Sequence, residues 1–360
     1  MLLAHKIELR PTLEQTEYLD KACGCRRHCY NQLLAHFMKD GVNWSKKAAQ
    51  QYYMKVLRVE FPWYNEVFIR ATENAINDLD NAYSHFFRRV KLGQKPGYPK
   101  FKKKNINDSF TMREVGKKVI EGRKLKISRL GSTINMRQKV RFEGKVKRVT
   151  VSKRAGKYFA SILVETDSYD GKNPEQKSVG VDFGIKDLAT CSNGKVFPAN
   201  QKLKASLRKL KRKQRQLSRK KKGSNRRAKA KQAVAKLHYR ISNQRSAVLH
   251  QVSDYLTKTF KLITIEDLNV KGMVKNHKLA RAVSDAGFYM LRSQIEYKAN
   301  LRNVDVVIAD RWFPSSKICS NCGEKNSELV LGVSEWVCQH CNTAHDRDLN
   351  AAINLENYSQ

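Results

Sequence analysis

The chain is 360 residues long and 41% hydrophobic, which is enough to bury a sizeable core in about two or three domains. Its formal net charge is +38, from 71 Lys and Arg against 33 Asp and Glu, and a compact fold with that charge needs a polyanionic partner. Basic residues occur in every region rather than in one amphipathic helix, so nucleic acid is favoured over an anionic membrane. The opening residues become polar too soon for a secretory signal, and no apolar run is long enough to span a bilayer. We therefore expect a cytoplasmic, nucleoid-associated protein with no membrane contact.

The first 170 residues have the pattern of a strand, then helices, then more strands. Ala4–Arg10 alternates apolar and polar residues like a strand, and Thr12 to Gln15 reads as a capping box at the start of a helix. Residues 12–92 are predicted to be helical, and 101–166 to form short antiparallel strands of a barrel or sandwich. The first strand could join that sheet, which would make the helical unit an insertion. Residues 171–174 are the predicted linker.

A second sheet is predicted from residue 178 onward. Val179–Gly184, Leu188–Cys191 and Lys195–Phe197 read as successive strands connected by hairpins. Leu262–Ile265 and Val304–Ala309 are apolar enough to be strands buried on both faces. The pattern predicts a mixed α/β sheet with a long helical insertion.

That insertion, residues 201–253, contains no acidic residue, and 202–231 holds 16 Lys or Arg. We predict a helical hairpin that turns near residues 223–225 and is closed by apolar residues at heptad-like spacing: Leu203, Leu207, Leu210, Leu217, Val234, Leu237, Ile241 and Val248. A charge run is often only a solvated helix face, but no Glu is present here to form stabilising pairs along the helix. A phosphate-tracking arm is therefore favoured. We expect phosphate contacts from this arm and from one residue beyond it: Lys209, Lys211, Arg212, Lys213, Arg215, Arg219, Arg226, Arg227 and Arg311.

Two Cys-x-x-Cys pairs separated by 15 residues predict a structural zinc ion held by Cys319, Cys322, Cys338 and Cys341. Two disulfides are the alternative, which conflicts with the expected intracellular location. His340 and His345 lie close by, but four thiolates already complete a tetrahedron, so this zinc has no open position for chemistry. The other cysteines lack such spacing and are predicted to pack as small apolar residues: Cys23, Cys25, Cys29 and Cys191.

Three carboxylates stand where metal-dependent phosphodiester chemistry would need them. Asp182 lies in an apolar strand, where an unpaired charge is costly, and Glu266 follows a buried strand at its carboxyl edge. The third is Asp348 or Asp346 at the start of the last helix, although either could simply cap that helix. This trio is similar to the acids of RNase H-like nucleases, in which two Mg²⁺ ions about 4 Å apart activate water and stabilise the leaving oxygen. Turn or surface roles are the better reading for Asp187, Asp267 and Asp310.

Four ordered motifs carry a family resemblance. They are GVDFGIK at Gly180–Lys186, IEDL at Ile265–Leu268, FPSSK at Phe313–Lys317 and HDRDLNAA at His345–Ala352. With the cysteine pairs, they make the chain resemble TnpB, the transposon-encoded, RNA-guided DNA endonucleases related to type V CRISPR effectors. In the family's pattern the catalytic acids fall on Asp182, Glu266 and Asp348.

The resemblance implies a multidomain α/β architecture. Residues 1–11 and 93–170 would form a β-barrel wedge domain, with 12–92 inserted as a helical recognition domain. An RNase H-like RuvC domain would follow over 178–314 and 345–360, interrupted by the basic hairpin and by a zinc ribbon at 315–344 that binds target nucleic acid.

The resemblance also implies a function. The protein would bind a guide RNA from the transposon end and cut complementary double-stranded DNA beside a short flanking motif, using two Mg²⁺ ions. Base pairing would supply sequence specificity and the basic protein would hold the phosphates. Two alternatives are a guided DNA-binding repressor, which in related proteins has lost the acids, and an unguided RNase H-like nuclease or transposase.

Overall fold

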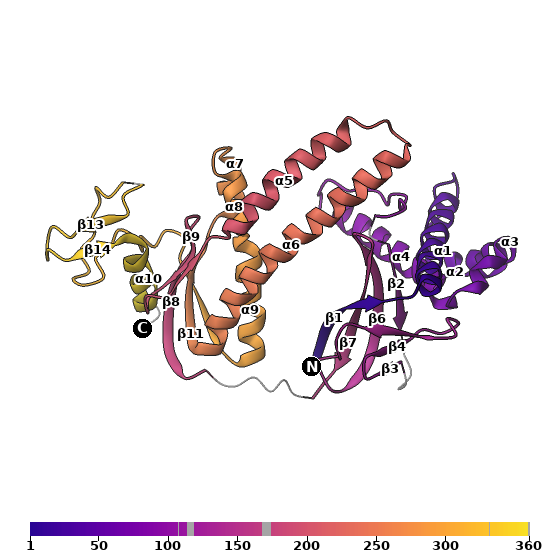
Figure 1. The fold of residues 1–360 in the computed structure, drawn as a ribbon, viewed down its shortest axis with the longest axis horizontal. Coiled ribbons are helices and arrows are strands. Elements are labelled where there is room, and N and C mark those ends of the chain that lie inside the picture. Colours follow the sequence, from indigo (N-terminus) through magenta and orange to yellow (C-terminus); the bar gives the residue numbers. More distant parts are fainter. Residues whose placement is uncertain (107, 114–118, 168–173, 331, 359–360) are drawn as a thin grey trace. The chain divides into compact units, whose positions relative to one another are not determined.

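The computed structural model describes residues 1–360 except 107, 114–118, 168–173, 331 and 359–360 (Figure 1). The chain divides into two compact units, Met1–Ser168 and Tyr169–Gln360. Most of the predicted linker, 171–173, lies outside the described residues. None of the helices built from described residues has both the length and the apolar character that a membrane-spanning segment requires.

The first unit contains a seven-stranded antiparallel sheet in the order β2-β6-β7-β1-β5-β4-β3. Its strands are β1 (Leu2–Arg10), β2 (Ser109–Arg113), β3 (Ile120–Glu121), β4 (Lys124–Lys126), β5 (Thr133–Met136), β6 (Lys145–Arg154) and β7 (Lys157–Glu165). The first strand pairs with β7 and β5 in the middle of the sheet, as the sequence predicts. The sequence predicted a barrel or a sandwich, and in the described residues β2 and β3 are the outermost strands of this one sheet.

Helices fill the interval between β1 and β2. They are α1 (Leu13–Phe37), α2 (Lys46–Tyr52), the π-helical η1 (Tyr53–Leu57), α3 (Arg58–Glu60), the 3₁₀ helix η2 (Pro62–Glu66) and α4 (Ile69–Lys91). The capping box at the start of α1 is confirmed: the Gln15 amide donates to Thr12 Oγ1 at 3.3 Å, and the Thr12 amide donates to Gln15 Oε1 at 3.1 Å. Three of the unpaired cysteines, Cys23, Cys25 and Cys29, are buried in the core, which confirms their apolar role. Burial raises the pKa of the Cys23 thiol to about 12, so it stays protonated.

The second unit is built on a five-stranded mixed sheet in the order β10-β9-β8-β11-β12. Its strands are β8 (Gln176–Asp182), β9 (Asp187–Cys191), β10 (Val196–Pro198), β11 (Phe260–Glu266) and β12 (Asp305–Ala309). Strands β8, β11 and β12 run parallel, while β9 and β10 return antiparallel. The prediction that the last strand is buried on both faces is wrong, because Asp305 and Ile308 are exposed. This strand lies at the sheet edge, where one side has no strand to pair with among the described residues.

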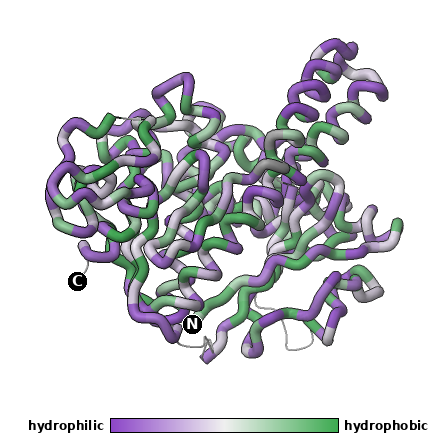
Figure 2. The backbone as a smooth tube through the Cα atoms, turned by 60° about the vertical axis from the view of Figure 1, so that its left-hand side comes forward, coloured by the Kyte–Doolittle hydropathy of each residue, from purple (hydrophilic) through white to green (hydrophobic). Residues whose placement is uncertain are grey.

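Beyond this sheet, the described residues of the unit form six helices and a separate two-stranded sheet. They are α5 (Gln201–Ser218), α6 (Asn225–Thr259), α7 (Val270–Lys275), α8 (Ala280–Ala286), α9 (Phe288–Arg302), β13 (Glu335–Val337), β14 (Ala344–Asp346) and α10 (Arg347–Tyr358). Helices α5 and α6 form the predicted hairpin, and Figure 2 shows it as mostly hydrophilic. The predicted apolar seam is confirmed by a separate small core of Leu203, Leu210, Val234, Leu237 and Ile241.

Candidate metal centres and nucleic-acid surface

The three predicted carboxylates lie together at the carboxyl ends of β8 and β11, which form one edge of the second sheet. Asp182 is the last residue of β8 and Glu266 is the last residue of β11. These strands are parallel, with Ile265 opposite Val181, so the two acids end neighbouring strands side by side. Asp348 lies in the first turn of α10, which packs on β8.

The contact between α10 and β8 depends on Gly180. A Cβ atom at this position would overlap the carbonyl oxygen of Ala352 and the amide nitrogen of Glu356, so only glycine allows the helix to lie this close. The Ser178 hydroxyl donates to Glu356 Oε1 at 2.6 Å and fixes the same contact from a neighbouring position. The missing side chain of Gly180 therefore brings the helix that carries Asp348 to the strand that carries Asp182.

We expect Gly180→Ala to destabilise the protein, because the added methyl group must push the backbone of α10 away from the sheet. Overpacking of this kind costs about 1–3 kcal/mol, which lowers the melting temperature by roughly 2–4 °C per kcal/mol in a domain of this size. Thermal unfolding followed by circular dichroism measures the change. Gly97→Ala is the matched control, since nothing lies within 4 Å of a Cβ there. An unchanged melting temperature for Gly180→Ala would contradict the close contact.

All three carboxylates have a raised pKa. The pKa of Asp182 lies well above its ordinary value because the group is buried and because Glu266 and Asp348 are negative. The pKa of Glu266 is raised chiefly by burial, and that of Asp348 by burial and then by Asp346. Three ionised acids at this edge would repel one another unless a cation neutralises them. Carboxylate oxygens are the ligands that Mg²⁺ prefers, so this donor set fits that ion.

In the structure, Asp346 caps helix α10. Its Oδ1 accepts a hydrogen bond of 2.8 Å from the amide of Leu349, which makes Asp346 the N-cap of α10. Its side chain is exposed, whereas Asp348 is half-buried. Of the two candidates, Asp348 also has the larger effect on the pKa of Asp182.

Ser315 belongs to this site, and the sequence reasoning assigned it no role. It is 5% exposed, and its hydroxyl donates to Glu266 Oε1 at 2.8 Å. The Asn354 side chain on α10 donates to the Ser315 carbonyl at 2.8 Å and holds the loop in place. The FPSSK motif that contains Ser315 was the available signal, but a bond across 49 positions cannot be read from local spacing.

The four cysteines fit a structural zinc ion. Their sulfur atoms all lie within 4.8 Å of one another, with Cys319 and Cys341 at 3.5 Å and Cys322 and Cys338 at 3.7 Å. A tetrahedral ion with Zn–S bonds of about 2.3 Å would place its sulfurs roughly 3.8 Å apart. In the described part of the chain no other set of three His, Cys, Asp or Glu gathers this closely. The carboxylates are thus spaced more widely than the thiolates.

The two knuckles use the same backbone turn with different residues. Gly323 follows the first Cys-x-x-Cys with φ of 78°, and Asn342 follows the second with φ of 57°. Each donates its amide to the carbonyl of the first cysteine of its knuckle, at 2.9 and 2.8 Å. Both positions need the left-handed region, which Gly and Asn tolerate best.

His345 lies beside the cluster without completing it. Its Nε2 is 3.0 Å from Cys319 Sγ, and its ring packs on Trp336 with centroids 4.7 Å apart. A thiolate sulfur accepts hydrogen bonds, so this nitrogen is placed to donate to the ligand rather than to replace it. His340 is exposed.

The ribbon is attached to the helix that carries the third acid. Strand β14 ends at Asp346 and α10 begins at Arg347, with no residue between them. Asn350 on α10 donates to the Ile318 carbonyl at 2.7 Å and accepts from the Ser320 amide at 2.9 Å. The first knuckle is therefore clamped onto α10.

The predicted phosphate-binding residues divide into two groups. Six have exposed side chains on or beside the hairpin helices: Lys209, Lys211, Arg212, Arg215, Arg219 and Arg226. Lys213 is half-buried. Arg227 donates to the carbonyls of Leu217 and Lys220 at 2.9 and 2.7 Å and so holds the hairpin turn. Arg311 forms an ion pair with Asp267.

Family models match three parts of the chain. Residues 161–277 match OrfB_IS605, described as "Probable transposase", and 288–355 match the Cas12f1-like TNB domain. Residues 1–39 match a helix-turn-helix domain of the same OrfB group.

Relatives that match almost the whole chain support the same family assignment. A Streptomyces pristinaespiralis protein with the name "Putative RNA-guided DNA endonuclease" is 35% identical over 98% of this chain and 88% of its own length. The Escherichia coli K12 protein with the name "Putative RNA-guided DNA endonuclease InsQ" is 31% identical over 98% of this chain and 91% of its own length. Among solved structures, the Cas12f1–sgRNA–target DNA complex aligns with a TM-score of 0.57 and 14% identity, covering 96% of this chain and 83% of that one.

The α/β fold is thus similar to that of Cas12f1, and it carries a zinc-ribbon-like TNB domain. The family is shown by the sequence identity of 35% and 31% to relatives that match 98% of this chain. The chain belongs to the TnpB family, the OrfB proteins of IS605-type transposons.

Proposed function

We propose that this chain is an RNA-guided DNA endonuclease that cuts phosphodiester bonds at the edge formed by Asp182, Glu266 and Asp348. The observation that carries the proposal is the convergence of these acids from β8, β11 and α10, each with a raised pKa, in a member of the TnpB family. Relatives named RNA-guided DNA endonuclease support the guided activity. Cleavage beside a short flanking motif rests on the family resemblance.

The three acids would hold Mg²⁺, and Ser315 would orient Glu266 through its hydrogen bond. When bound, two such ions activate a water and stabilise the leaving 3′ oxygen of an in-line displacement. The zinc ribbon would keep α10, and hence Asp348, at this edge. The exposed Lys and Arg of the hairpin would contact the phosphates of guide RNA and DNA, while base pairing supplies the sequence specificity.

The proposal is tested with protein purified together with its RNA. We expect it to cut a plasmid that matches the guide in the presence of Mg²⁺, and to leave a mismatched plasmid intact. Target binding without cutting would favour a guided repressor. Cutting by RNA-free protein would favour an unguided nuclease or a transposase, and either result would contradict the proposal.

The two acids at the start of α10 are separable by mutation. We expect Asp348→Asn to lose cleavage, because it removes a charge from the metal site. Asp346→Asn should keep cleavage and lose about 1 kcal/mol of stability or less, because asparagine also caps helices. Cleavage rates and melting temperatures of both variants decide the assignment. Loss of cutting in Asp346→Asn together with normal cutting in Asp348→Asn would reverse it.

A further inference from the structure

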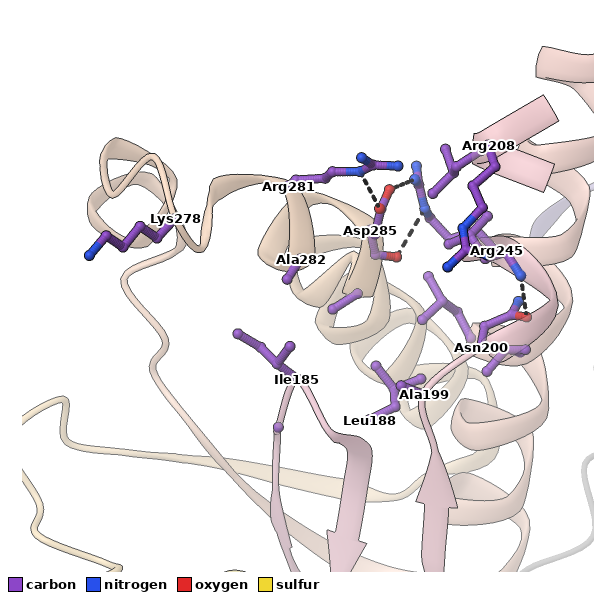
Figure 3. A pocket seen from close by; sticks show the side chains of 16 residues that line it. Ile185, Leu188, Ala199, Asn200, Arg208, Arg245, Lys278, Arg281, Ala282 and Asp285 are labelled. Carbon is purple, nitrogen blue, oxygen red and sulfur yellow. Dashed lines mark hydrogen bonds and ion pairs between the residues drawn. The ribbon is translucent and has the colours of Figure 1, made fainter. Parts of the chain in front are cut away.

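A cavity of about 480 Å³ lies at the base of the basic hairpin (Figure 3). It is enclosed by α5, α6, α8 and the loop between β8 and β9. Side chains from all four elements form an apolar floor: Ile185, Leu188, Leu207, Val248, Ala282 and Ala286. The volume falls in the range of pockets that hold a small organic ligand.

The charged residues around this floor are mainly positive. Arg208, Arg245, Lys278 and Arg281 line the cavity together with one acid, Asp285. Arg245 Nη2 donates to Asp285 Oδ1 at 2.8 Å, and Arg281 Nε lies 3.8 Å from Oδ2 of the same group. Four cations against one acid leave a net charge of +3. An apolar floor with such a rim is suited to an aromatic group that carries phosphate.

The cavity lies within one loop of the carboxylates. Gly184 and Ile185 line it, and they follow Asp182 by two and three positions. Three residues span at most about 10 Å, the length of roughly three stacked nucleotides. Lys186 at the end of this loop and Asp187 at the start of β9 are near enough to Asp348 to influence its pKa.

We infer that this cavity binds one unpaired nucleotide of the DNA strand that is cut, with its base on the apolar floor and its phosphates on Arg208, Lys278 and Arg281. The inference rests on the proposed nuclease function. Apolar contact of the base would anchor the strand beside the acids, because every base has a face that packs on such a floor. An apolar peptide would not need the positive rim, and an acidic peptide would not need the floor.

The test uses the complex of the protein with its own guide RNA. Matched DNA carries 2-aminopurine at successive positions of the cut strand, in an Asp182→Asn background that leaves the DNA whole. We expect one position to become bright, because its base leaves the stack, and Ala282→Phe to abolish that signal by filling the cavity. A signal from 2-aminopurine in the guide RNA, or none at any position of the DNA, would overturn the inference.

Cleavage of unlabelled DNA by the chain with Asp182 intact gives the second readout. We expect Ala282→Phe and Arg208→Ala each to slow cutting about tenfold, and an abasic site at the bright position to do the same in the parent. The matched controls are Val274→Phe and Lys275→Ala, exposed residues on α7 that do not line the cavity and lie outside the basic hairpin. They should cut at the parent rate.

The two readouts separate the possible failures. Equal slowing by Arg208→Ala and Lys275→Ala would mean that the positive rim acts only by general attraction of phosphate, and this would refute the cavity as a nucleotide site. If the parent complex cuts no DNA, the proposed function fails, and the fluorescence still decides whether the cavity takes a base. Melting temperatures identify any variant that has merely unfolded.

Discussion

Asp182→Asn protein is expected to cut matched DNA roughly a thousandfold more slowly than the parent chain. Asparagine keeps the shape of the side chain but removes the central charge of the trio, and a metal-based stabilisation of several kcal/mol corresponds to that factor in rate. Initial rates in Mg²⁺ measure the loss. Affinities for guide RNA and matched DNA should stay within a few fold, since binding depends on the basic surface.

The control for this experiment is Asp267→Asn. Asp267 follows Glu266 directly, but it is occupied by ion pairs with Arg292 and Arg311, which hold its pKa below the ordinary value. It should therefore contribute no ligand, and its variant should still cut. Normal cutting by Asp182→Asn would remove the basis for placing metal at this edge.

Removing zinc is expected to have the second large effect. Structural zinc sites contribute about 10–16 kcal/mol of apparent folding free energy in small domains, so a chelator or Cys338→Ser should unfold residues 319–346. Because the first knuckle is clamped to α10, Asp348 would lose its position and cleavage would stop. Metal content, limited proteolysis within the ribbon and cleavage rate measure these outcomes. Guide RNA binding through the hairpin should persist.

His340→Ala is the matched control for the zinc experiment. His340 lies between the two cysteines of the second knuckle, but its side chain is exposed, so its variant should keep one zinc per chain and normal cutting. A parent chain without zinc, or a Cys338→Ser chain that folds and cuts normally, would contradict the supporting role of the ribbon.

The sequence predicted structural features correctly where each depends on residues close together in the chain. The capping box of Thr12 and Gln15, the apolar seam of the hairpin and the two cysteine knuckles each depend on spacing within a few turns of chain. Asp182 was noticed because an acid in an apolar strand is costly.

Other features could be identified only from the three-dimensional structure. Which acid caps α10 depends on the residue where the helix begins, and a start two positions later would make Asp348 the N-cap in place of Asp346. The bond from Ser315 to Glu266 and the packing of α10 on Gly180 join distant segments, so no local pattern contains them. The exposure of β12 followed from its place at the sheet edge, which its apolar composition does not reveal.

The absence of acids from residues 201–253 makes the hairpin a polyelectrolyte. Its own charges oppose its folding when no polyanion is present, whereas bound nucleic acid would replace small counterions around it. Salt therefore has opposite consequences in the two states: it shields the free hairpin and supports its helices, but it weakens the complex. Under the proposed function, the negative charge of a bound guide RNA would offset this repulsion and complete the fold of the hairpin.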